Sequence, residues 1–315
     1  MTVADAGEFG LIARITARLG SGPTTLLGPG DDAAIVTASD GRVVASTDVL
    51  VEGRHFRCDW SSATDVGHRA AGANLADIAA MGAVPTALLV ALCAPPDLDV
   101  KWVEELADGL AAEAALAGAS VVGGDISAST VLTIAVTALG DLRGCNPVLR
   151  SGANAGDIVA VAGQLGCAAA GLTVLSRGFR SPKALVDAYR RPTIPYASGP
   201  AAARMGATSM IDISDGLLAD LGHVATASGV GIDVETASIT VAAALRDVSA
   251  ALAVDPYTWI LAGGDDHALA ATFPASAVLT DEWQVIGRVQ EGSGVTVDGK
   301  AYEGGPPGWD HFRVG

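Results

Sequence analysis

The sequence predicts an α+β protein built from two α/β-type domains: an N-terminal mixed sheet with helices and a C-terminal α/β sandwich. Three observations lead to this class. Segments with apolar residues at helical spacing alternate along the chain with short β-branched runs. The 315 residues suggest about two domains of ordinary size. Half of the residues are hydrophobic and only 17% are charged, which is enough to bury a core in each domain.

The N-terminal domain is expected to span residues 1–145. An amphipathic helix is predicted from Glu8 to Leu19, where apolar residues recur at helical spacing, and a Gly-Pro-Gly-Asp-Asp turn at residues 28–32 follows it. Beyond this turn, strands are predicted at residues 33–37, 42–47, 86–93, 120–122 and 131–139, and helices at residues 64–81 and 100–116. This mixed order predicts a sheet with helices packed against it.

The glycine-rich and proline-containing segment 142–156 is predicted as the domain boundary, and the second domain is expected at residues 146–315. Strands are predicted there at residues 158–162, 208–211 and 268–273, and helices at residues 167–176, 183–189 and 199–205. A further helix is expected to open at Asp215, and a turn at Gly263-Gly264 precedes the last of these strands.

Charge argues against a nucleic-acid partner. The chain has 26 Asp, 9 Glu, 16 Arg and three Lys, which gives a net charge of −16, whereas affinity for a phosphate backbone needs clustered cations. Codon preference of the genome would by itself explain this skew. None of the three lysines, Lys101, Lys183 and Lys300, lies in a P-loop or protein-kinase motif. Any phosphate chemistry therefore has to proceed without a motif lysine.

The first twenty residues do not read as a secretory signal, and no apolar run approaches the ~18 residues that span a bilayer. A cytoplasmic enzyme with no membrane partner is therefore expected. The cysteines at positions 58, 93, 145 and 167 are widely spaced, without a C-x-x-C motif or a zinc-finger histidine pair. We interpret them as reduced structural thiols.

Aspartate recurs beside glycine or other small residues at expected strand ends and helix starts. The five segments are Gly28 to Asp32, Ser46 to Asp48, Gly123 to Asp125, Asp212 to Gly216 and Gly263 to Asp266. Asp77 is expected within a helix, where Asp has no intrinsic preference. Short carboxylates on turns suit hard cations, and glycine lets a phosphate approach the main chain. Turn formation or helix capping, for example by Asp215, is the local alternative for any one segment.

Taken together, these segments favour a site with several Mg²⁺ ions, although spacing alone does not show that they converge. No run fits the EF-hand pattern. A nucleoside triphosphate that meets a phosphorylated acceptor brings like charges together, at a cost of about 4 kcal/mol for each unit pair near 4 Å. Divalent ions held by carboxylates can offset this repulsion and stabilise phosphoryl transfer.

Seven ordered motifs resemble those of the thiamine-monophosphate kinase family, which belongs to the aminoimidazole ribonucleotide synthetase superfamily. They are G-P-G-D-D-A-A, S-T-D-V-L-V-E-G-R-H-F, N-L-A-D-I-A-A-M-G-A, V-G-G-D, D-I-S-D-G-L, L-A-G-G-D-D-H and G-W-D-H-F, spread from about Gly7 to Phe312. The resemblance implies direct transfer of the γ-phosphoryl group of ATP to thiamine monophosphate, the final step of thiamine diphosphate biosynthesis. It also implies several Mg²⁺ ions and a homodimer formed by the N-terminal domain, with the C-terminal domain completing the nucleotide and substrate site.

The resemblance also implies roles for particular residues. The metal ligands would be Asp32, Ser46, Thr47, Asp48, Asp77, Asp125, Asp212 and Asp215, of which Asp48, Asp125 and Asp212 would be the catalytic residues. ATP would contact Gly124, Arg150 and Ser214. Thiamine monophosphate would contact His55, Asp265 and Trp309, and the indole suits a flat pyrimidine or a cationic thiazolium.

Position 265 departs from the family pattern, because the motif usually reads G-G-E-D and this chain has Asp265 in place of the Glu. The shorter side chain withdraws the carboxylate by about one methylene. A non-catalytic Mg²⁺- or nucleotide-binding protein is therefore the alternative from another class. The nearest rivals are other members of the superfamily: selenophosphate synthetases, a hydrogenase maturation protein that would end in a reactive cysteine, and aminoimidazole ribonucleotide synthetase itself, which lacks the second and last motifs. Selenophosphate synthetases are expected to carry a reactive Cys or selenocysteine and a Lys near the N-terminal glycine loop, whereas the first such residues here are Cys58 and Lys101.

Overall fold

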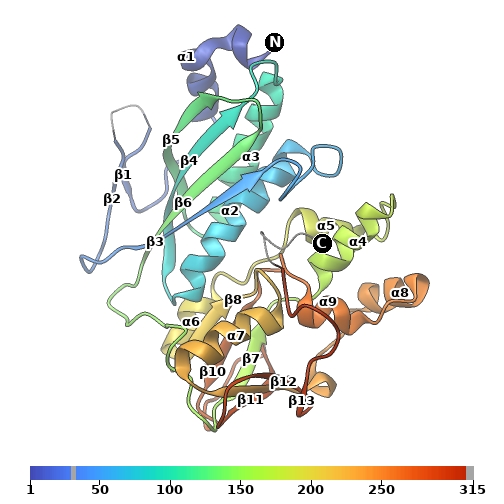
Figure 1. Ribbon diagram of the computed structural model, residues 1–315. Helices are drawn as coiled ribbons and strands as arrows, with labels where there is room; N and C mark the ends of the chain where they lie inside the picture. The colour runs from blue at the N-terminus through green and yellow to red at the C-terminus, as the bar shows by residue number, and fades with distance from the viewer. Residues whose placement is uncertain (30–32, 310–315) are drawn as a thin grey trace. The chain divides into compact units, whose positions relative to one another are not determined.

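A computed structural model describes residues 1–29 and 33–309 (Figure 1). The chain divides into two compact units. Unit 1 holds Met1–Ile78 and Ala83–Gly144, and unit 2 holds Ala79–Gly82 and Cys145–Gly315. Each unit combines helices with a mixed sheet, so the predicted class of two α/β-type domains is confirmed.

Unit 1 contains helices α1 (Val3–Thr16), α2 (Ala63–Ala80, whose last two residues belong to unit 2) and α3 (Val100–Leu116). Its strands are β1 (Thr25–Leu27), β2 (Ile35–Val36), β3 (Val44–Val51), β4 (Val84–Ala94), β5 (Ser120–Ala128) and β6 (Thr133–Asp141). The four-stranded sheet has the order β3-β6-β4-β5, with β4 and β5 parallel and the other two pairs antiparallel. Strands β1 and β2 form a separate antiparallel pair.

The two long helices of unit 1 cross closely at two glycines. A Cβ atom on Gly67 of α2 would lie 2.3 Å from the carbonyl oxygen of Leu106, and one on Gly109 of α3 would lie 2.2 Å from the carbonyl oxygen of Thr64. No larger residue fits at either position without separating the helices. The inward residues of the central strand β6, among them Ile134 and Val136, are fully buried, so the core of unit 1 lies along this strand.

The opposite face of this sheet stays open within the unit. Val49 of β3 and Leu89 of β4 are 49% and 39% exposed, and Ala135 and Thr137 of β6 are half-buried. Strand alternation explains the contrast, since successive side chains point to opposite faces.

Unit 2 contains helices α4 (Cys167–Ser176), α5 (Lys183–Arg190), α6 (Ser198–Arg204), α7 (Leu217–Ser228), α8 (Ala243–Leu252) and α9 (Pro256–Ala262), with a 3₁₀ turn at Thr236–Ser238. Its strands are β7 (Ile158–Ala162), β8 (Ser209–Asp212), β9 (Gly231–Val234), β10 (Leu269–Phe273), β11 (Trp283–Gln290), β12 (Gly294–Val297) and β13 (Lys300–Ala301). They form one sheet in the order β13-β12-β9-β11-β7-β10-β8. Strand β12 runs parallel to β9, and the other pairings between the described strands are antiparallel.

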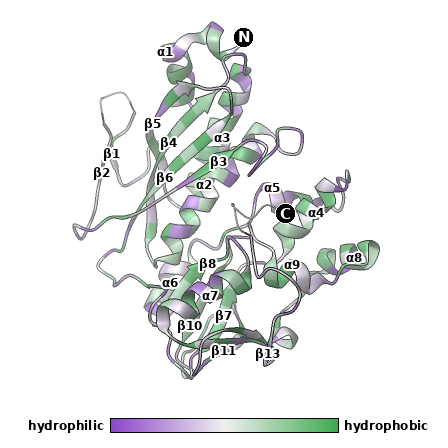
Figure 2. Ribbon diagram, viewed as in Figure 1, coloured by the Kyte–Doolittle hydropathy of each residue, from purple (hydrophilic) through white to green (hydrophobic). Residues whose placement is uncertain are grey.

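The core of unit 2 lies along β7 and β10, where Val159, Ala160, Leu269 and Phe273 are fully buried. Figure 2 shows the hydrophobic colouring of β7, as well as of β4 in unit 1. Within residues 1–29 and 33–309, no helix is long and apolar enough to cross a membrane.

Candidate functional site

In unit 1, two alternate residues of β3 are held by two residues one turn apart on α2. The Ser46 hydroxyl donates to Oδ2 of Asp77 at 2.5 Å, and the backbone N–H of Asp48 donates to Oδ1 of Asn74 at 2.9 Å. Residues i and i+2 of a strand share a face, as do residues i and i+3 of a helix. This match between the two periodicities places Ser46 and the backbone of Asp48 against Asp77 and Asn74 of α2.

Thr47 lies between Ser46 and Asp48 on β3, and its side chain is on the other face of the sheet. Its hydroxyl donates to the carbonyl oxygen of Val136 at 3.0 Å and accepts a hydrogen bond from Thr137 Oγ1 at 3.1 Å. Strand alternation therefore separates the Thr47 hydroxyl from the Ser46 hydroxyl.

Gly124 and Asp125 lie on β5, at the opposite edge of the same sheet. The register joins Asp48, Val136, Val90 and Gly124 in one row across β3, β6, β4 and β5. Three strand spacings of ~4.8 Å separate the ends of this row by about 14 Å. A Cβ on Gly124 would lie only 1.9 Å from the carbonyl oxygen of Val90, so glycine is required there.

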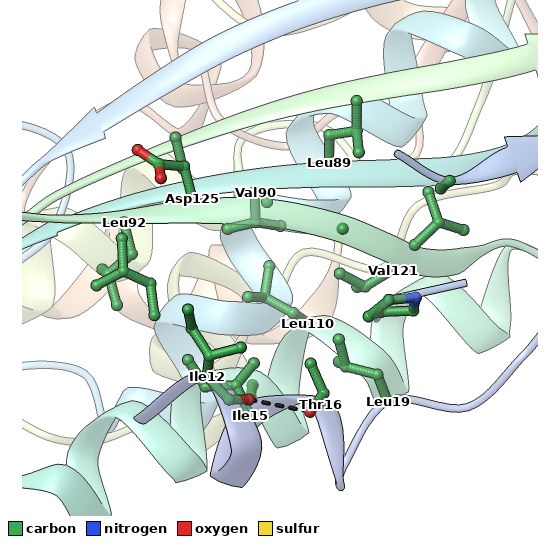
Figure 3. A pocket seen from close by; sticks show the side chains of 18 of the residues that line it. Ile12, Ile15, Thr16, Leu19, Leu89, Val90, Leu92, Leu110, Val121 and Asp125 are labelled. Carbon is green, nitrogen blue, oxygen red and sulfur yellow. Dashed lines mark hydrogen bonds between the residues drawn. The ribbon is translucent and has the colours of Figure 1, made fainter. Parts of the chain in front are cut away.

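A largely apolar groove of about 840 Å³ opens beside Gly124 and Asp125 (Figure 3). Its walls come mainly from α1, α3, β4, β5 and β6, and they include Ile12, Leu110 and Val121. Figure 3 shows the carboxylate of Asp125 pointing away from Ile12 and Leu110, so the groove combines a surface for a flat apolar group with an anionic position at its border.

His55 follows β3, and its protonation state is fixed by a main-chain contact. The backbone N–H of Val51 donates to Nδ1 of His55 at 2.9 Å. A ring nitrogen that accepts cannot carry a proton, so this arrangement assigns the neutral ring with its proton on Nε2. The half-buried His55 thus offers an N–H donor at Nε2.

In unit 2, the loop between β8 and α7 pairs with the segment after α9. The N–H groups of Asp265 and His267 donate to the carbonyl oxygens of Ser214 and Ile213 at 2.8 and 2.9 Å. Both donors have positive φ, 67° for Asp265 and 49° for His267. A Cβ on Gly264 would lie 2.2 Å from the Ser214 carbonyl oxygen. The two Asp-Gly motifs of this domain therefore meet, although they are about 50 residues apart in sequence.

Asp212 ends β8 and is only 4% exposed. Nδ1 of His267 lies 3.1 Å from its Oδ2 atom, and both side chains are buried. His267 therefore fixes the orientation of the Asp212 carboxylate.

Asp215 does not cap α7, which is the local role that its position suggested. The N-cap is Gly216, and no side chain of that residue can bond to the helix. Oδ2 of Asp220 instead accepts the N–H groups of Ser214, Asp215 and Gly216 at 3.1, 3.1 and 3.0 Å. Burial, followed by the charge of Asp212, raises the pKa of Asp220 to about 7, and the charge of Asp215 adds to the increase.

Trp309 reaches the same loop. Its backbone N–H donates to the Asp215 carbonyl oxygen at 2.9 Å, and a Cβ on Gly308 would lie 2.8 Å from that oxygen. Trp309 is 64% exposed. Arg150 lies elsewhere in unit 2, because its carbonyl oxygen accepts from Ser228 at the far end of α7. Unit 2 thus gathers Asp212, Ser214, Asp215, Asp265 and Trp309 in one region, and the backbone of Arg150 lies outside it.

The oxygen donors of each unit fit Mg²⁺. Within the described ranges 1–29 and 33–309, no group of three or more His, Cys, Asp or Glu side chains could by itself hold a metal ion. Mg²⁺ is commonly held by one or two carboxylates, with waters and substrate phosphates completing its octahedron. The pairs Asp48 with Asp77 and Asp212 with Asp215 suit that mode of binding. Asp32 lies outside the described residues.

Three residues that hold the candidate site residues of the two units were not identified from the sequence. Asn74 and Asp220 act on main-chain groups, and His267 acts on Asp212. The signal for Asn74 was its place three residues before Asp77 on a helix. Asp220 carried a weaker signal, as an Asp in the first turn of a helix whose N-cap is Gly.

Comparison with known families adds evidence over the whole chain. The family model described as AIR synthase related protein, N-terminal domain, matches residues 30–142, and that of the C-terminal domain matches residues 154–300. The thiamine-monophosphate kinase of Mycobacterium tuberculosis is 47% identical, covering 99% of this chain and 93% of the relative. That of Corynebacterium glutamicum is 42% identical, covering 86% of this chain and 83% of the relative.

Solved structures agree with these matches. The thiamine-monophosphate kinase of Stenotrophomonas maltophilia superposes with a TM-score of 0.82 at 34% identity, covering 93% of this chain and 96% of that one. A structure described as AaThiL complexed with AMPPCP and TMP has a TM-score of 0.81 at 35% identity and covers 99% of both chains.

Proposed function

Since the chain belongs to the thiamine-monophosphate kinase family, we propose that it transfers the γ-phosphoryl group of ATP to thiamine monophosphate, giving thiamine diphosphate and ADP. The observation that carries this proposal is the 47% identity to a thiamine-monophosphate kinase over 99% of the chain. A related structure described as bound to AMPPCP and TMP supports the choice of both substrates. The reaction is a direct transfer to a phosphate acceptor and completes thiamine diphosphate biosynthesis.

The carboxylates of both units are the metal ligands in this proposal. Asp48 and Asp77, with the Ser46 hydroxyl bonded to Asp77, would hold Mg²⁺ from unit 1. Thr47, whose hydroxyl lies on the other face of β3, and Asp125, about 14 Å away on β5, would serve other ions. Asp212 and Asp215 would hold Mg²⁺ from unit 2. When bound, the ions neutralise the charge of the phosphate oxygens. Asp48, Asp125 and Asp212 are the catalytic residues of the set.

ATP would bind unit 1 through the groove beside β5. The apolar walls suit the flat adenine ring, and Gly124 lies in the wall of the groove, where it would contact ATP. Ser214 of unit 2 would contribute a further contact. Arg150, an exposed side chain with five donors, would supply the cationic contact for which no motif lysine exists.

Thiamine monophosphate would be bound by three side chains. The Nε2–H of His55 is a suitable donor to a phosphate oxygen. The exposed indole of Trp309 can stack on the pyrimidine or the cationic thiazolium. The carboxylate of Asp265, held in place by its backbone bond to Ser214, can accept from the aminopyrimidine or attract the thiazolium charge.

The functional form would be a homodimer. Val49 of β3, which is 49% exposed on the open face of the unit 1 sheet and lies outside the groove assigned to ATP, offers an apolar contact for a second copy of the chain. Sedimentation velocity would test this assembly, with Val49→Lys expected to yield monomer. A dimer that is unaffected by this charge would contradict the proposed face.

The activity is tested by incubating the protein with ATP, Mg²⁺ and thiamine monophosphate, and by measuring both ADP and thiamine diphosphate. Equal amounts of the two products are expected. Folded protein that binds ATP but forms neither product would support the alternative of a non-catalytic nucleotide-binding protein. Asp48→Asn should lower kcat by on the order of 10²-fold or more. Its stability without Mg²⁺ should be unchanged or higher, because one charge leaves a crowded acidic site.

A further inference from the structure

Asp220 occupies a position where a helix commonly binds an anion. Helix α7 spans 12 residues, and Asp220 lies in its first turn with 2% of its surface exposed. One carboxylate oxygen accepts three consecutive N–H groups, those of residues 214, 215 and 216. Consecutive N–H groups at a helix N-terminus form a concave site for a phosphate or carboxylate. The protein therefore fills this site with its own side chain.

These bonds differ from an ordinary helix cap. A capping side chain lies at the N-cap and satisfies donors within the first turn. Asp220 lies inside the helix and reaches back to Ser214 and Asp215, which precede the N-cap Gly216. The bonds therefore fix the loop that precedes the helix as well as the helix itself.

The carbonyl side of the same loop is fixed by other segments. Ser214 O accepts from the N–H of Asp265, Ile213 O from that of His267, and Asp215 O from that of Trp309. Asp220 fixes the other set of polar groups of the loop, since its carboxylate accepts hydrogen bonds from the N–H groups of residues 214–216. Loss of Asp220 would leave the carbonyl contacts in place and release only the N–H side.

We propose that Asp220 is a positioning residue, which holds the main chain of residues 214–216 so that Asp212 and Asp215 keep the geometry needed to bind Mg²⁺ with substrate. This inference rests on the proposed function for its effect on turnover. Asp220 is assigned no ligand role in this account, because its Oδ2 atom is shared by three N–H groups and the residue is almost completely buried. Outer contacts that orient metal ligands typically change metal affinity or activity 10–100-fold.

Hydrogen exchange of the full chain tests the structural part without substrate. In Asp220→Ala, the amides of residues 214–216 should exchange at least about 10-fold faster than in the parent protein, because each loses its acceptor. Asp157→Ala is the matched control, since Asp157 is also buried in unit 2 and accepts from Asn154 N–H and the Thr208 hydroxyl. It should leave exchange at residues 214–216 unchanged. Parental exchange in folded Asp220→Ala would overturn the proposal, whatever the protein's activity.

Mg²⁺ dependence of turnover tests the functional part. Asp220→Ala should raise the Mg²⁺ concentration for half-maximal activity about 10–100-fold, with a smaller change in kcat at saturating Mg²⁺. Asp220→Asn keeps an oxygen acceptor of the same reach and should stay within about 3-fold of the parent in both exchange and Mg²⁺ dependence. The proposal is wrong if Asp220→Asn shows the same exchange rates and Mg²⁺ dependence as Asp220→Ala. It is also wrong if Asp220→Ala fails to fold and the folded Asp220→Asn loses exchange protection at residues 214–216. Parent protein without kinase activity would refute the proposed function and leave the exchange result standing.

Discussion

The side chain of Asn74 holds the backbone of Asp48: its Oδ1 accepts the Asp48 N–H at 2.9 Å, while its Nδ2 donates to the carbonyl oxygen of Ala70 at 3.1 Å. Asn74 is completely buried. Both ends of its amide are thus used, one within α2 and one on β3. The orientation of a proposed catalytic carboxylate therefore depends on an uncharged side chain of the neighbouring helix.

Asn74→Ala should lower both stability and turnover. The substitution leaves the Asp48 N–H without its acceptor, at a cost of about 1–3 kcal/mol, measurable by urea unfolding. Thr86→Val is the matched control, because the buried Thr86 hydroxyl donates to the Leu139 carbonyl oxygen at 3.0 Å. The control should lose stability with kcat unchanged. Equal kcat in the two variants at matched fraction folded would contradict a positioning role for Asn74.

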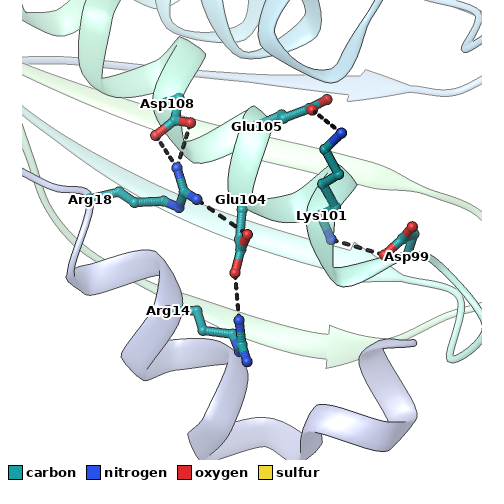
Figure 4. Close-up of polar contacts among 7 residues, drawn as sticks. All are labelled: Arg14, Arg18, Asp99, Lys101, Glu104, Glu105 and Asp108. Atoms are coloured by element: carbon teal, nitrogen blue, oxygen red, sulfur yellow. Dashed lines mark hydrogen bonds and ion pairs between the residues drawn. The ribbon is translucent and has the colours of Figure 1, made fainter. Parts of the chain in front are cut away.

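Helix α1 should detach from α3 in high salt or acid. Arg14 pairs with Glu104 at 2.8 Å, and Arg18 pairs with Glu104 at 3.2 Å and with Asp108 (Figure 4). The hydrogen bond from Arg14 holds the pKa of Glu104 below its usual 4.5. A depressed carboxyl pKa stabilises the folded state at neutral pH, and this contribution disappears as the pH falls through the native pKa. Salt screens such exposed pairs as well.

Limited proteolysis within α1 measures this release. Cleavage should be faster in 1 M salt than in 0.05 M salt, and Glu104→Gln should raise the low-salt rate. Glu105→Gln is the control, since Glu105 pairs with Lys101 of its own helix at 3.4 Å, as Figure 4 shows. If the two variants are cut at the same rate, the pairs between the helices do not hold α1.

Cys58 should resist alkylation although it is exposed. Burial of the thiol group, its hydrogen bond to Glu52 and the nearby charges raise the pKa to about 12. The thiolate is the nucleophile, and its fraction at pH 8 is then on the order of 10⁻⁴, compared with about 0.1 for an ordinary cysteine. Iodoacetamide labelling followed by mass spectrometry should show a rate about 10³-fold below that of a free thiol. Glu52→Gln should accelerate labelling, and labelling of the parent at the free-thiol rate would refute this environment.

Asp266 should make stability fall as the pH rises from about 4 to about 7. Burial raises its pKa to about 7, although its carboxylate accepts the N–H groups of Ala168 and Gly166. Between pH 4 and 7 the native state keeps a proton that the unfolded state has lost, so the free energy of unfolding decreases with pH. The change is on the order of 4 kcal/mol over the window. Urea unfolding of the parent and of Asp266→Asn at several pH values measures this change in the free energy of unfolding, because the variant has no carboxyl group to titrate at position 266. A parent-minus-variant difference that stays flat from pH 4 to 7 would rule it out.

The fold could be predicted where one pattern covers a whole element. The predicted spans of α3, β7 and α4 agree with the structure residue for residue, since each is a continuous run bounded by turn residues. Helix α1 is interrupted at Gly7 (φ 67°, ψ 167°), so the predicted start at Glu8 agrees with its second segment, whereas the first segment, which starts at Val3, was not predicted. Its start depends on a capping box between Thr2 and Asp5, a local bond pattern that apolar spacing does not reveal.

The later strands β9 and β11 to β13 were not predicted. Several are short, and β9 is stabilised by pairing with β11 about 50 residues away, which leaves little local signal. The same limit applies to the site. Motifs identified Asp48 and Asp212, but Asn74 and Asp220 act on main-chain N–H groups whose positions follow only from the folded loop.

Unit 2 is built from two separate segments of the chain, and this limits where the gene could be recombined with that of a relative. Residues Ala79–Gly82 belong to this unit although they lie some 60 residues before the rest of it. Met81 O accepts the Val148 N–H at 3.0 Å, and a Cβ on Gly199 would lie 2.0 Å from Ala79 O. A hybrid gene joined at Cys145 would therefore pair one parent's residues 79–82 with the other parent's Gly199. Such hybrid proteins should fold only when both parents have a glycine at position 199, which avoids a clash with the carbonyl oxygen of residue 79. Unit 2 is therefore encoded by two separate stretches of the gene that have to match.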